Sequence, residues 1–421
     1  MAITVPAPPV ENQDPWFEER DAFDQAVRSR LNEDLAPDAL SALIVERSGP
    51  SAGLRWIPVG DSLTSEQGGG APDIGWTVQA SMLSNGQLAP VRNAGISGNT
   101  SADIRARLAA DVLAYSPNLV SLWCGVNDIT QGRTLAQFQA DYRAIVDDIL
   151  ETGASVALFT IPPRDDLTKQ ATITAWNGWI RALAAEKRLN LVDAYAAISN
   201  PSTGDILSGF GSGDGVHLSA SGHNSVAQQF VAIMSERLPA GGIPMRPLVN
   251  DDPNNLLSNA LLLNAPGGTP TGWYPGGNSS VGVVEGLVDD ADFRGGKAWQ
   301  VEATNPGGYR EIVANGGSDW AVGDTLLFVC RAKVVSSSGV TTFKGLHVNA
   351  NFFGAASPTQ FVTRNVSVPG LNGIIAKRLV VPAGTTGPVQ VAVLFDFDST
   401  ASQTTRVGEF GIFNLTRLGL E

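Results

Sequence analysis

The chain contains a serine, a histidine and an aspartate in positions that suit acyl transfer. Ser62 directly follows the apolar run 56–59, and Asp214 lies three residues before His217. Serine is a weak nucleophile at neutral pH and needs an adjacent base, commonly a histidine oriented by a carboxylate. Asp214 and His217 are close enough to meet across one turn. The sequence therefore supplies a hydroxyl nucleophile and an acid/base pair.

Two further residues are candidates for stabilising a developing oxyanion. Gly95 follows a predicted strand, where a glycine lets the backbone approach a ligand and aim an N–H at it. Asn127 follows the next strand and offers a side-chain amide, and losing one such donor typically costs about 2.7–4 kcal/mol of transition-state stabilisation. The alternatives are a tight strand-to-helix turn at Gly95 and a simple turn cap at Asn127.

Other residues compete for the acid and base roles. His223 is an alternative base, although it falls inside a predicted helix among polar residues and is expected at the surface. Asp193 is the reserve candidate for the orienting acid, and His347 belongs to a later region. The segment around Ser62 lacks the second glycine of the G-x-S-x-G turn, which argues against a lipase-type α/β-hydrolase.

These residues occur within a region that alternates apolar strands with amphipathic helices. This alternation predicts a parallel sheet covered on both faces by right-handed crossovers. Ligands of such sheets bind beyond the carboxyl ends of the strands. The expected strands are 55–60, 90–93, 118–124, 154–160 and 189–192, and the expected helices are 74–84, 101–114, 134–151, 170–187 and 219–237.

The flanking regions differ in character, which predicts three domains: 1–50, 51–240 and 245–421. Residues 1–50 start with a proline-rich stretch, followed by a helical stripe of Trp16, Phe23, Val27 and Leu31 that packs on the next domain or docks to another subunit. Residues 245–421 are rich in Gly, Asn, Thr, Ser and Val in short β-rich runs, which indicates an all-β sandwich. The Gly- and Pro-containing segment 239–244 is the predicted linker.

Composition excludes several classes of function. A net charge of −13 over 421 residues argues against nucleic-acid partners, which require a basic face. The two cysteines, Cys124 and Cys330, fall in different predicted domains, and with only three histidines a catalytic zinc site is not expected. We therefore predict neither a metal nor a cofactor. The N-terminus has no basic n-region or long apolar run, so no signal peptide and no membrane insertion are expected.

Four segments together resemble the signature blocks of the SGNH/GDSL hydrolase family. They are 60–63 (GDSL), Gly95, 125–128 (GVND) and 214–217 (DGVH), in the family's order. The resemblance covers residues 55–238 and implies a flavodoxin-like three-layer α/β/α domain. It implies that Ser62 is the nucleophile, His217 the base and Asp214 the orienting acid. The Ser62 N–H, the Gly95 N–H and the Asn127 amide would form the oxyanion hole.

Two weaker resemblances concern the flanks. The segments 255–259 and 272–274 are similar to the start of jelly-roll carbohydrate-binding modules. Trp273, Trp299 and other aromatics would then offer faces for sugar stacking, whereas in an ordinary sandwich they would belong to the core. Residues 16–35 resemble the openings of some tail proteins of tailed bacteriophages, some of which carry an SGNH domain.

The combined reading is a serine esterase that removes acetyl groups from a polysaccharide, on a virion tail if the protein is viral and in the cytoplasm otherwise. Asp61 and Arg164 are further candidates for substrate binding. The expected partners are an acetylated glycan and either a homo-oligomer or phage tail and baseplate proteins. The alternatives are a catalytically silent receptor-binding tail protein and a soluble bacterial lipase or thioesterase.

Overall fold

A computed structural model of the chain describes most residues after position 53. These are residues 54–65, 75–236, 238, 246–278, 282–304, 308–338, 345–366, 368–397 and 402–420. The predicted N-terminal helix and the linker 239–244 lie outside the described residues. The predicted domain boundaries stay a prediction.

Five parallel strands form the sheet that carries the site. They are β1 (Trp56–Gly60), β2 (Ala94–Gly95), β3 (Leu119–Trp123), β4 (Ser155–Phe159) and β5 (Asn190–Val192). Their order is β2-β1-β3-β4-β5, which is the doubly wound, flavodoxin-like order. Every residue of β1 and β3 is buried, as expected for central strands covered on both faces.

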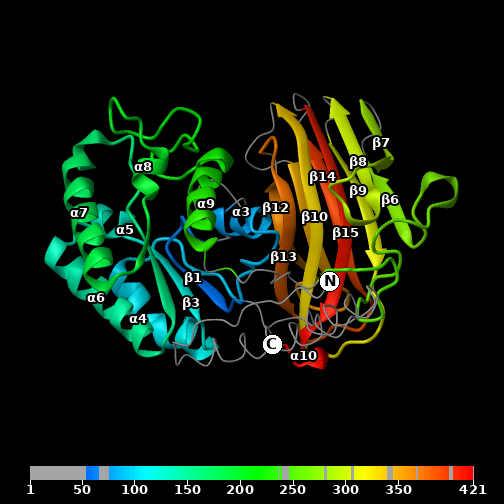
Figure 1. The fold of residues 1–421 in the computed structure, drawn as a ribbon, viewed down its shortest axis with the longest axis horizontal. Coiled ribbons are helices and arrows are strands. Elements are labelled where there is room, and N and C mark those ends of the chain that lie inside the picture. The colour runs from blue at the N-terminus through cyan, green and yellow to red at the C-terminus, as the bar shows by residue number, and fades with distance from the viewer. Residues whose placement is uncertain are drawn as a thin grey trace, which may run out of the picture. The chain divides into compact units, whose positions relative to one another are not determined.

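Helices cover both faces of this sheet (Figure 1). The helices are α3 (Trp76–Leu83), α4 (Ser101–Asp111), α5 (Val126–Thr130), α6 (Leu135–Glu151), α7 (Gln170–Lys187), α8 (Ala194–Ile198) and α9 (Ala220–Met234). Helices α3 and α9 pack together on one face, and α4, α6 and α7 cover the other. Capping boxes begin α4 at Thr100 and α6 at Thr134. The predicted three-layer α/β/α fold is confirmed.

The sequence prediction differed from the structure at three elements. Strand β2 spans only Ala94–Gly95, not 90–93. Pro90 has no N–H for a ladder, and the Asn93 side chain accepts a hydrogen bond from the Gly95 N–H at 2.9 Å, so the chain turns before it pairs regularly. Helices α5 and α8 were not predicted, because five residues are too few to show a helical period.

The C-terminal region forms two five-stranded antiparallel sheets. Their strands are β6 (Trp273–Gly277), β7 (Val283–Asp289), β8 (Lys297–Thr304), β9 (Gly308–Asn315), β10 (Thr325–Ser338), β11 (Gly345–Phe352), β12 (Thr359–Val366), β13 (Asn372–Val380), β14 (Val389–Phe397) and β15 (Ser402–Asn414), followed by helix α10 (Leu415–Leu418). The sheet orders are β13-β10-β15-β8-β7 and β12-β11-β14-β9-β6.

The two sheets share one apolar core. Phe328 on β10 and Phe352 on β11 meet edge to face, with ring centroids 6.1 Å apart. Trp273 on β6 and Phe410 on β15 also join the sheets, with their rings tilted by 40° and the centroids 4.2 Å apart. The all-β sandwich predicted for this region is confirmed. Across the described ranges, no helix is both long enough and apolar enough to cross a bilayer.

Candidate active site

Ser62 lies in a tight turn immediately after β1. The Asp61 carbonyl accepts hydrogen bonds from the N–H groups of Thr64 at 3.2 Å and Ser65 at 2.9 Å. Strand β1 lies between β2 and β3, at the point where the strand order reverses, which is where ligands of such sheets bind. The turn therefore places the partly exposed Ser62 side chain at the carboxyl edge of the sheet.

Ser62, His217 and Asp214 form a continuous hydrogen-bonded chain, although 155 residues separate the serine from the histidine. The His217 Nε2 atom lies 2.8 Å from the Ser62 Oγ. On the other side of the ring, Nδ1 lies 2.5 Å from the Asp214 Oδ2. In this geometry Nδ1–H donates to the carboxylate, which leaves Nε2 as a proton acceptor for the serine. This is the arrangement that activates a serine nucleophile.

Asp214 is held in its ionised form. Its Oδ1 accepts hydrogen bonds from the backbone N–H groups of Val216 at 2.9 Å and His217 at 2.8 Å. Partial burial acts to raise the pKa of this carboxyl, but the hydrogen bonds from the His217 ring and the two N–H groups outweigh it and lower the pKa to about 2. Asp214 therefore carries a full charge at neutral pH and orients the His217 ring.

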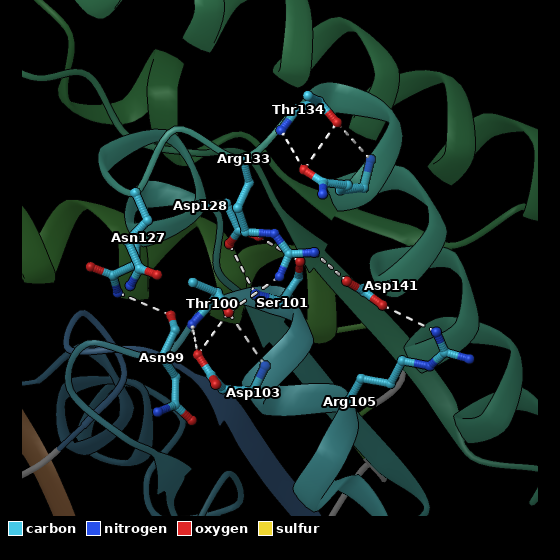
Figure 2. A network of polar contacts seen from close by, with 12 residues as sticks. Asn99, Thr100, Ser101, Asp103, Arg105, Asn127, Asp128, Arg133, Thr134 and Asp141 are labelled. Carbon is cyan, nitrogen blue, oxygen red and sulfur yellow. Dashed lines mark hydrogen bonds and ion pairs between the residues drawn. The ribbon is translucent and has the colours of Figure 1, made fainter.

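Asn127 lies in the first turn of α5, just after β3. Its Nδ2 donates to the Asn99 carbonyl oxygen at 3.0 Å. An amide nitrogen carries two hydrogens, so this bond fixes the side chain and leaves one donor for a ligand. Asn99 belongs to the loop between β2 and α4, so Asn127 is tied to the strand neighbouring that of Ser62 (Figure 2).

The expectation that the Gly95 N–H serves the oxyanion is wrong. That N–H already donates to the Asn93 Oδ1 at 2.9 Å. Gly95 is required for a different reason, since a Cβ there would lie 2.4 Å from the Ser65 nitrogen and 2.6 Å from the Thr64 carbonyl carbon. The absence of a side chain at Gly95 lets β2 pack directly against the turn that carries Ser62.

Gly98 is the residue that the sequence analysis missed. It lies in the same loop with a φ of +81°, a conformation that favours glycine, and a Cβ there would meet nothing within 4 Å. Across the described ranges its N–H has no protein acceptor, while its neighbour Asn99 is bound by Asn127. The sequence does contain a signal for this loop. Thr100 and Asp103 have the spacing of a capping box, which marks the start of a helix and places Gly98 in the loop just before it.

Asp61 is enclosed within the turn that carries Ser62. It is fully buried, and its Oδ1 accepts the Leu63 N–H at 3.0 Å. Burial, opposed by the Leu63 N–H and assisted by the negative charge of Asp128, raises the pKa of Asp61 to about 7. The prediction of a substrate-binding role is therefore wrong; Asp61 shapes the turn that presents Ser62.

Arg164 lies beside the site. Its Nη1 donates to the Thr130 Oγ1 at 2.9 Å, and the next residue, Asp165, donates its N–H to the Gly215 carbonyl at 3.1 Å. The segment thus bridges α5 and the loop that carries Asp214 and His217. A substrate-binding role for Arg164 stays a prediction.

Trp273 and Trp299 are core residues of the sandwich, exposed by only 2% and 3%. The expectation that they stack on sugars is wrong, because neither ring offers a free face. Tyr274, one residue after Trp273, points the other way on the strand and is 63% exposed.

The competing acid and base lie elsewhere. His223 is buried in α9 and not at the surface, as the sequence had suggested. Burial, and secondarily the nearby His217, lowers its pKa to about 4, so it stays neutral. Asp193 caps α8 and pairs with Arg181 at 2.9 Å. Cys124 and Cys330 are buried, and burial raises the pKa of both thiols.

No group of three His, Cys, Asp or Glu side chains with the geometry of a metal site occurs in the part of the chain that the structure describes. The prediction of a reaction without a metal or cofactor stays a prediction.

The middle of the chain is similar to known acyl hydrolases. Residues 59–224 match the model of the GDSL-like lipase/acylhydrolase family. An acetylxylan esterase from Geobacillus stearothermophilus is 28% identical over 154 residues, which are 34% of this chain and 70% of that protein. Residues 59–224 therefore have the sequence pattern of the GDSL-like lipase/acylhydrolase family, which supports an ester hydrolase domain in this part of the chain.

Two solved structures resemble part of the chain at low identity. A GDSL-like lipase from Bacteroides thetaiotaomicron is 18% identical with a TM-score of 0.38, covering 47% of this chain and 98% of its own. The lipase/acylhydrolase from Enterococcus faecalis is 24% identical with a TM-score of 0.37, covering 44% of this chain and 96% of its own.

Proposed function

We propose that this chain is a serine esterase in which Ser62 is the nucleophile, His217 the general base and Asp214 the orienting acid. The observation that carries this proposal is the unbroken chain of contacts from the Ser62 Oγ through the His217 ring to the Asp214 carboxylate, at 2.8 and 2.5 Å. Among the described residues, the side chain that is hydrogen-bonded to the Ser62 hydroxyl is that of His217, whereas His223 is buried in α9 and Cys124 is buried directly after β3.

The reaction proceeds in two steps. The Ser62 Oγ attacks the ester carbonyl carbon while His217 Nε2 takes its proton, and the resulting imidazolium is stabilised by Asp214. His217 then gives this proton to the departing alcohol, leaving an acyl-serine. A water molecule, deprotonated by His217, attacks the acyl-serine and releases the carboxylic acid and the free serine.

The oxyanion of each tetrahedral intermediate needs preorganised donors. We assign this role to the Ser62 N–H, the second Nδ2 hydrogen of Asn127 and the Gly98 N–H, which replaces Gly95 in the set. Gly98 is supported by its position one residue from the carbonyl that Asn127 binds and by its lack of an acceptor among the described residues. Its positive φ is the conformation that aims a loop N–H outward without strain.

The proposed substrate is an O-acetyl ester of a polysaccharide. The 28% identity to an acetylxylan esterase supports it. The resemblance of segments 255–259 and 272–274, at the start of the β-sandwich, to carbohydrate-binding modules also supports it. Activity that rises steeply with acyl-chain length would instead indicate a lipase or thioesterase.

The test compares the Ser62→Ala variant with the parent on p-nitrophenyl acetate and on acetylated xylan, with acetate release as the readout. Removing the nucleophile is expected to lower kcat by at least about a thousandfold. Ser202→Ala, an exposed loop serine, is the matched control and is expected to keep full activity. Equal rates for the parent and Ser62→Ala would refute the esterase and favour a silent receptor-binding protein.

Attachment to a virion is a separate proposal for the N-terminal region. It rests on the resemblance of residues 16–35 to phage tail proteins, and those residues lie outside the described ranges. Co-purification of the chain with intact phage particles tests it; recovery of the chain only in the free protein fraction would contradict it.

A further inference from the structure

Asp128, the residue after Asn127, is a fully buried carboxyl group that the proposed reaction does not use. Both of its oxygens are bound by the same residue at the start of α4. The Ser101 N–H donates to Oδ2 at 2.9 Å, and the Ser101 hydroxyl donates to Oδ1 at 2.6 Å. A buried charge costs several kcal/mol unless it is paired and hydrogen-bonded, so these bonds must be kept for the local fold to persist.

Asn127 and Asp128 hold the start of α4 by hydrogen bonds to the residues on either side of its N-cap (Figure 2). Asn127 binds the Asn99 carbonyl at 3.0 Å, and Asp128 binds Ser101. Thr100, between these two partners, is the N-cap of α4. Two adjacent residues of α5 thus hold Asn99, in the loop that contains Gly98, and Ser101, the first residue of α4. Two of the three groups proposed as oxyanion donors, Asn127 Nδ2 and the Gly98 N–H, therefore belong to a single cross-linked unit.

Arg133 and Asp141 complete the unit. The Arg133 Nε lies 3.4 Å from the Asp128 Oδ1, and its Nη2 pairs with the Asp141 Oδ2 of α6 at 2.5 Å. Arg105 of α4 reaches the other oxygen of Asp141 at 3.1 Å. Helices α4, α5 and α6 are thus tied through one chain of charged groups, and the positive charge of Arg133 offsets the buried charge of Asp128.

We propose that Asp128 is a positioning residue, which holds Asn127 and the loop 96–100 in the geometry required to receive the oxyanion. This inference deepens the proposed function and rests on it. Donor placement matters because a displacement of about 1 Å can cost on the order of a hundredfold in rate. Since Asp128 touches no reacting atom, its effect passes entirely through Asn127 and the loop.

The test measures kcat and KM on p-nitrophenyl acetate for Asp128→Ala and Asp128→Asn. Asp128→Ala removes both acceptors and is expected to lower kcat by about a hundredfold with KM changed less than about threefold. Asp128→Asn keeps an acceptor for the Ser101 N–H and is expected to retain more activity. A change confined to KM, or an unchanged kcat, overturns the proposal.

A matched control separates positioning from general stability. Asp193 also accepts bonds from a helix N–H, a hydroxyl and an arginine, but on α8. Asp193→Ala is expected to destabilise the protein while kcat stays within about twofold. An equal loss of kcat in Asp193→Ala and Asp128→Ala would mean that any lost helix cap has the same effect, which overturns the proposal.

A double-mutant cycle with Asn127→Ala tests whether Asp128 acts through Asn127. Asn127→Ala is expected to cost about 10²–10³ in kcat, and adding Asp128→Ala should cost little more than this. Multiplicative losses contradict the proposal. If Asp128→Ala does not fold, Ser101→Ala, which removes only the hydroxyl donor, takes its place in the cycle.

A readout without catalysis keeps this inference distinct from the esterase proposal. Amide hydrogen exchange in residues 96–101 and 126–128 is expected to rise at least tenfold in Asp128→Asn and to stay unchanged in Asp193→Ala. If the parent is inactive but exchange responds in this way, the esterase proposal fails while the cross-linked unit stands. Unchanged exchange at 96–101 overturns the inference whatever the activity.

Discussion

The two histidines near the site show that residue type alone does not reveal the surroundings of a side chain. His217 and His223 lie six positions apart, and neither burial nor partner can be read from the residue type. His217 contacts a carboxylate and a hydroxyl, whereas the His223 ring is buried in α9 with its Nδ1 unbonded among the described residues. The first has the surroundings of a base, and the second is a neutral core residue.

His223 is expected to make the protein less stable in mild acid. The unfolded chain binds a proton at His223 below pH 6.5, but the folded chain does so only near pH 4. The folded pKa is depressed, so its contribution to stability is complete above pH 6.5 and is lost as pH falls to 4. The loss is about 3 kcal/mol.

Urea unfolding of the parent and His223→Gln at pH 7, 5.5 and 4.5 measures this effect. The free energy of unfolding should fall more steeply with decreasing pH in the parent than in the variant. Parallel pH profiles for the two proteins would show that His223 is protonated in the folded state at its ordinary pKa.

Elements carry the second level of organisation, and the two capping boxes illustrate it. Thr100 starts α4 and Thr134 starts α6, each with the N3 side chain returning its bond to the cap. The two boxes are equivalent as helix starts. Only the capping box of Thr100 adjoins the residues that Asn127 and Asp128 bind. Thr134 is exposed at the start of α6.

Thr100→Ala and Thr134→Ala are therefore expected to separate stability from activity. Each loses a cap, which costs about 1 kcal/mol of stability. Thr100→Ala should also lower kcat on p-nitrophenyl acetate by about tenfold, because the loop with Gly98 is loosened. Thr134→Ala should keep full kcat. Equal kcat values in both variants would place the loop outside the oxyanion site.

At the scale of the whole molecule, an α/β ester hydrolase domain is joined in one chain to a β-sandwich. The sandwich core is built from aromatic and branched side chains of both sheets, including Trp273 and Trp299. The neighbouring Tyr274 lies on the other side of β6 and is exposed. A sugar-stacking role for the sandwich thus depends on exposed rings such as Tyr274.

Substitutions at Trp273 and Tyr274 are expected to act differently although the residues are adjacent. Trp273→Ala should lower the free energy of unfolding by about 3–5 kcal/mol, because it opens a cavity in the core. Tyr274→Ala should change it by less than about 0.5 kcal/mol. Chemical denaturation measures both. A strongly destabilised Tyr274→Ala would show that this ring is packed.

The sequence alone predicted the parallel α/β fold, the β-sandwich and the contact set of Ser62, Asp214 and His217. Those features depend on local period and on short motifs, and alternation of apolar residues is visible without knowing what packs against them. The tertiary structure alone decided that Gly95 supports a turn, that Asp61 and the two tryptophans are buried, and that Asp128 joins α5 to the start of α4. Such facts depend on contacts between residues far apart in the chain, where one hydrogen bond or one covered face changes the role of a residue type.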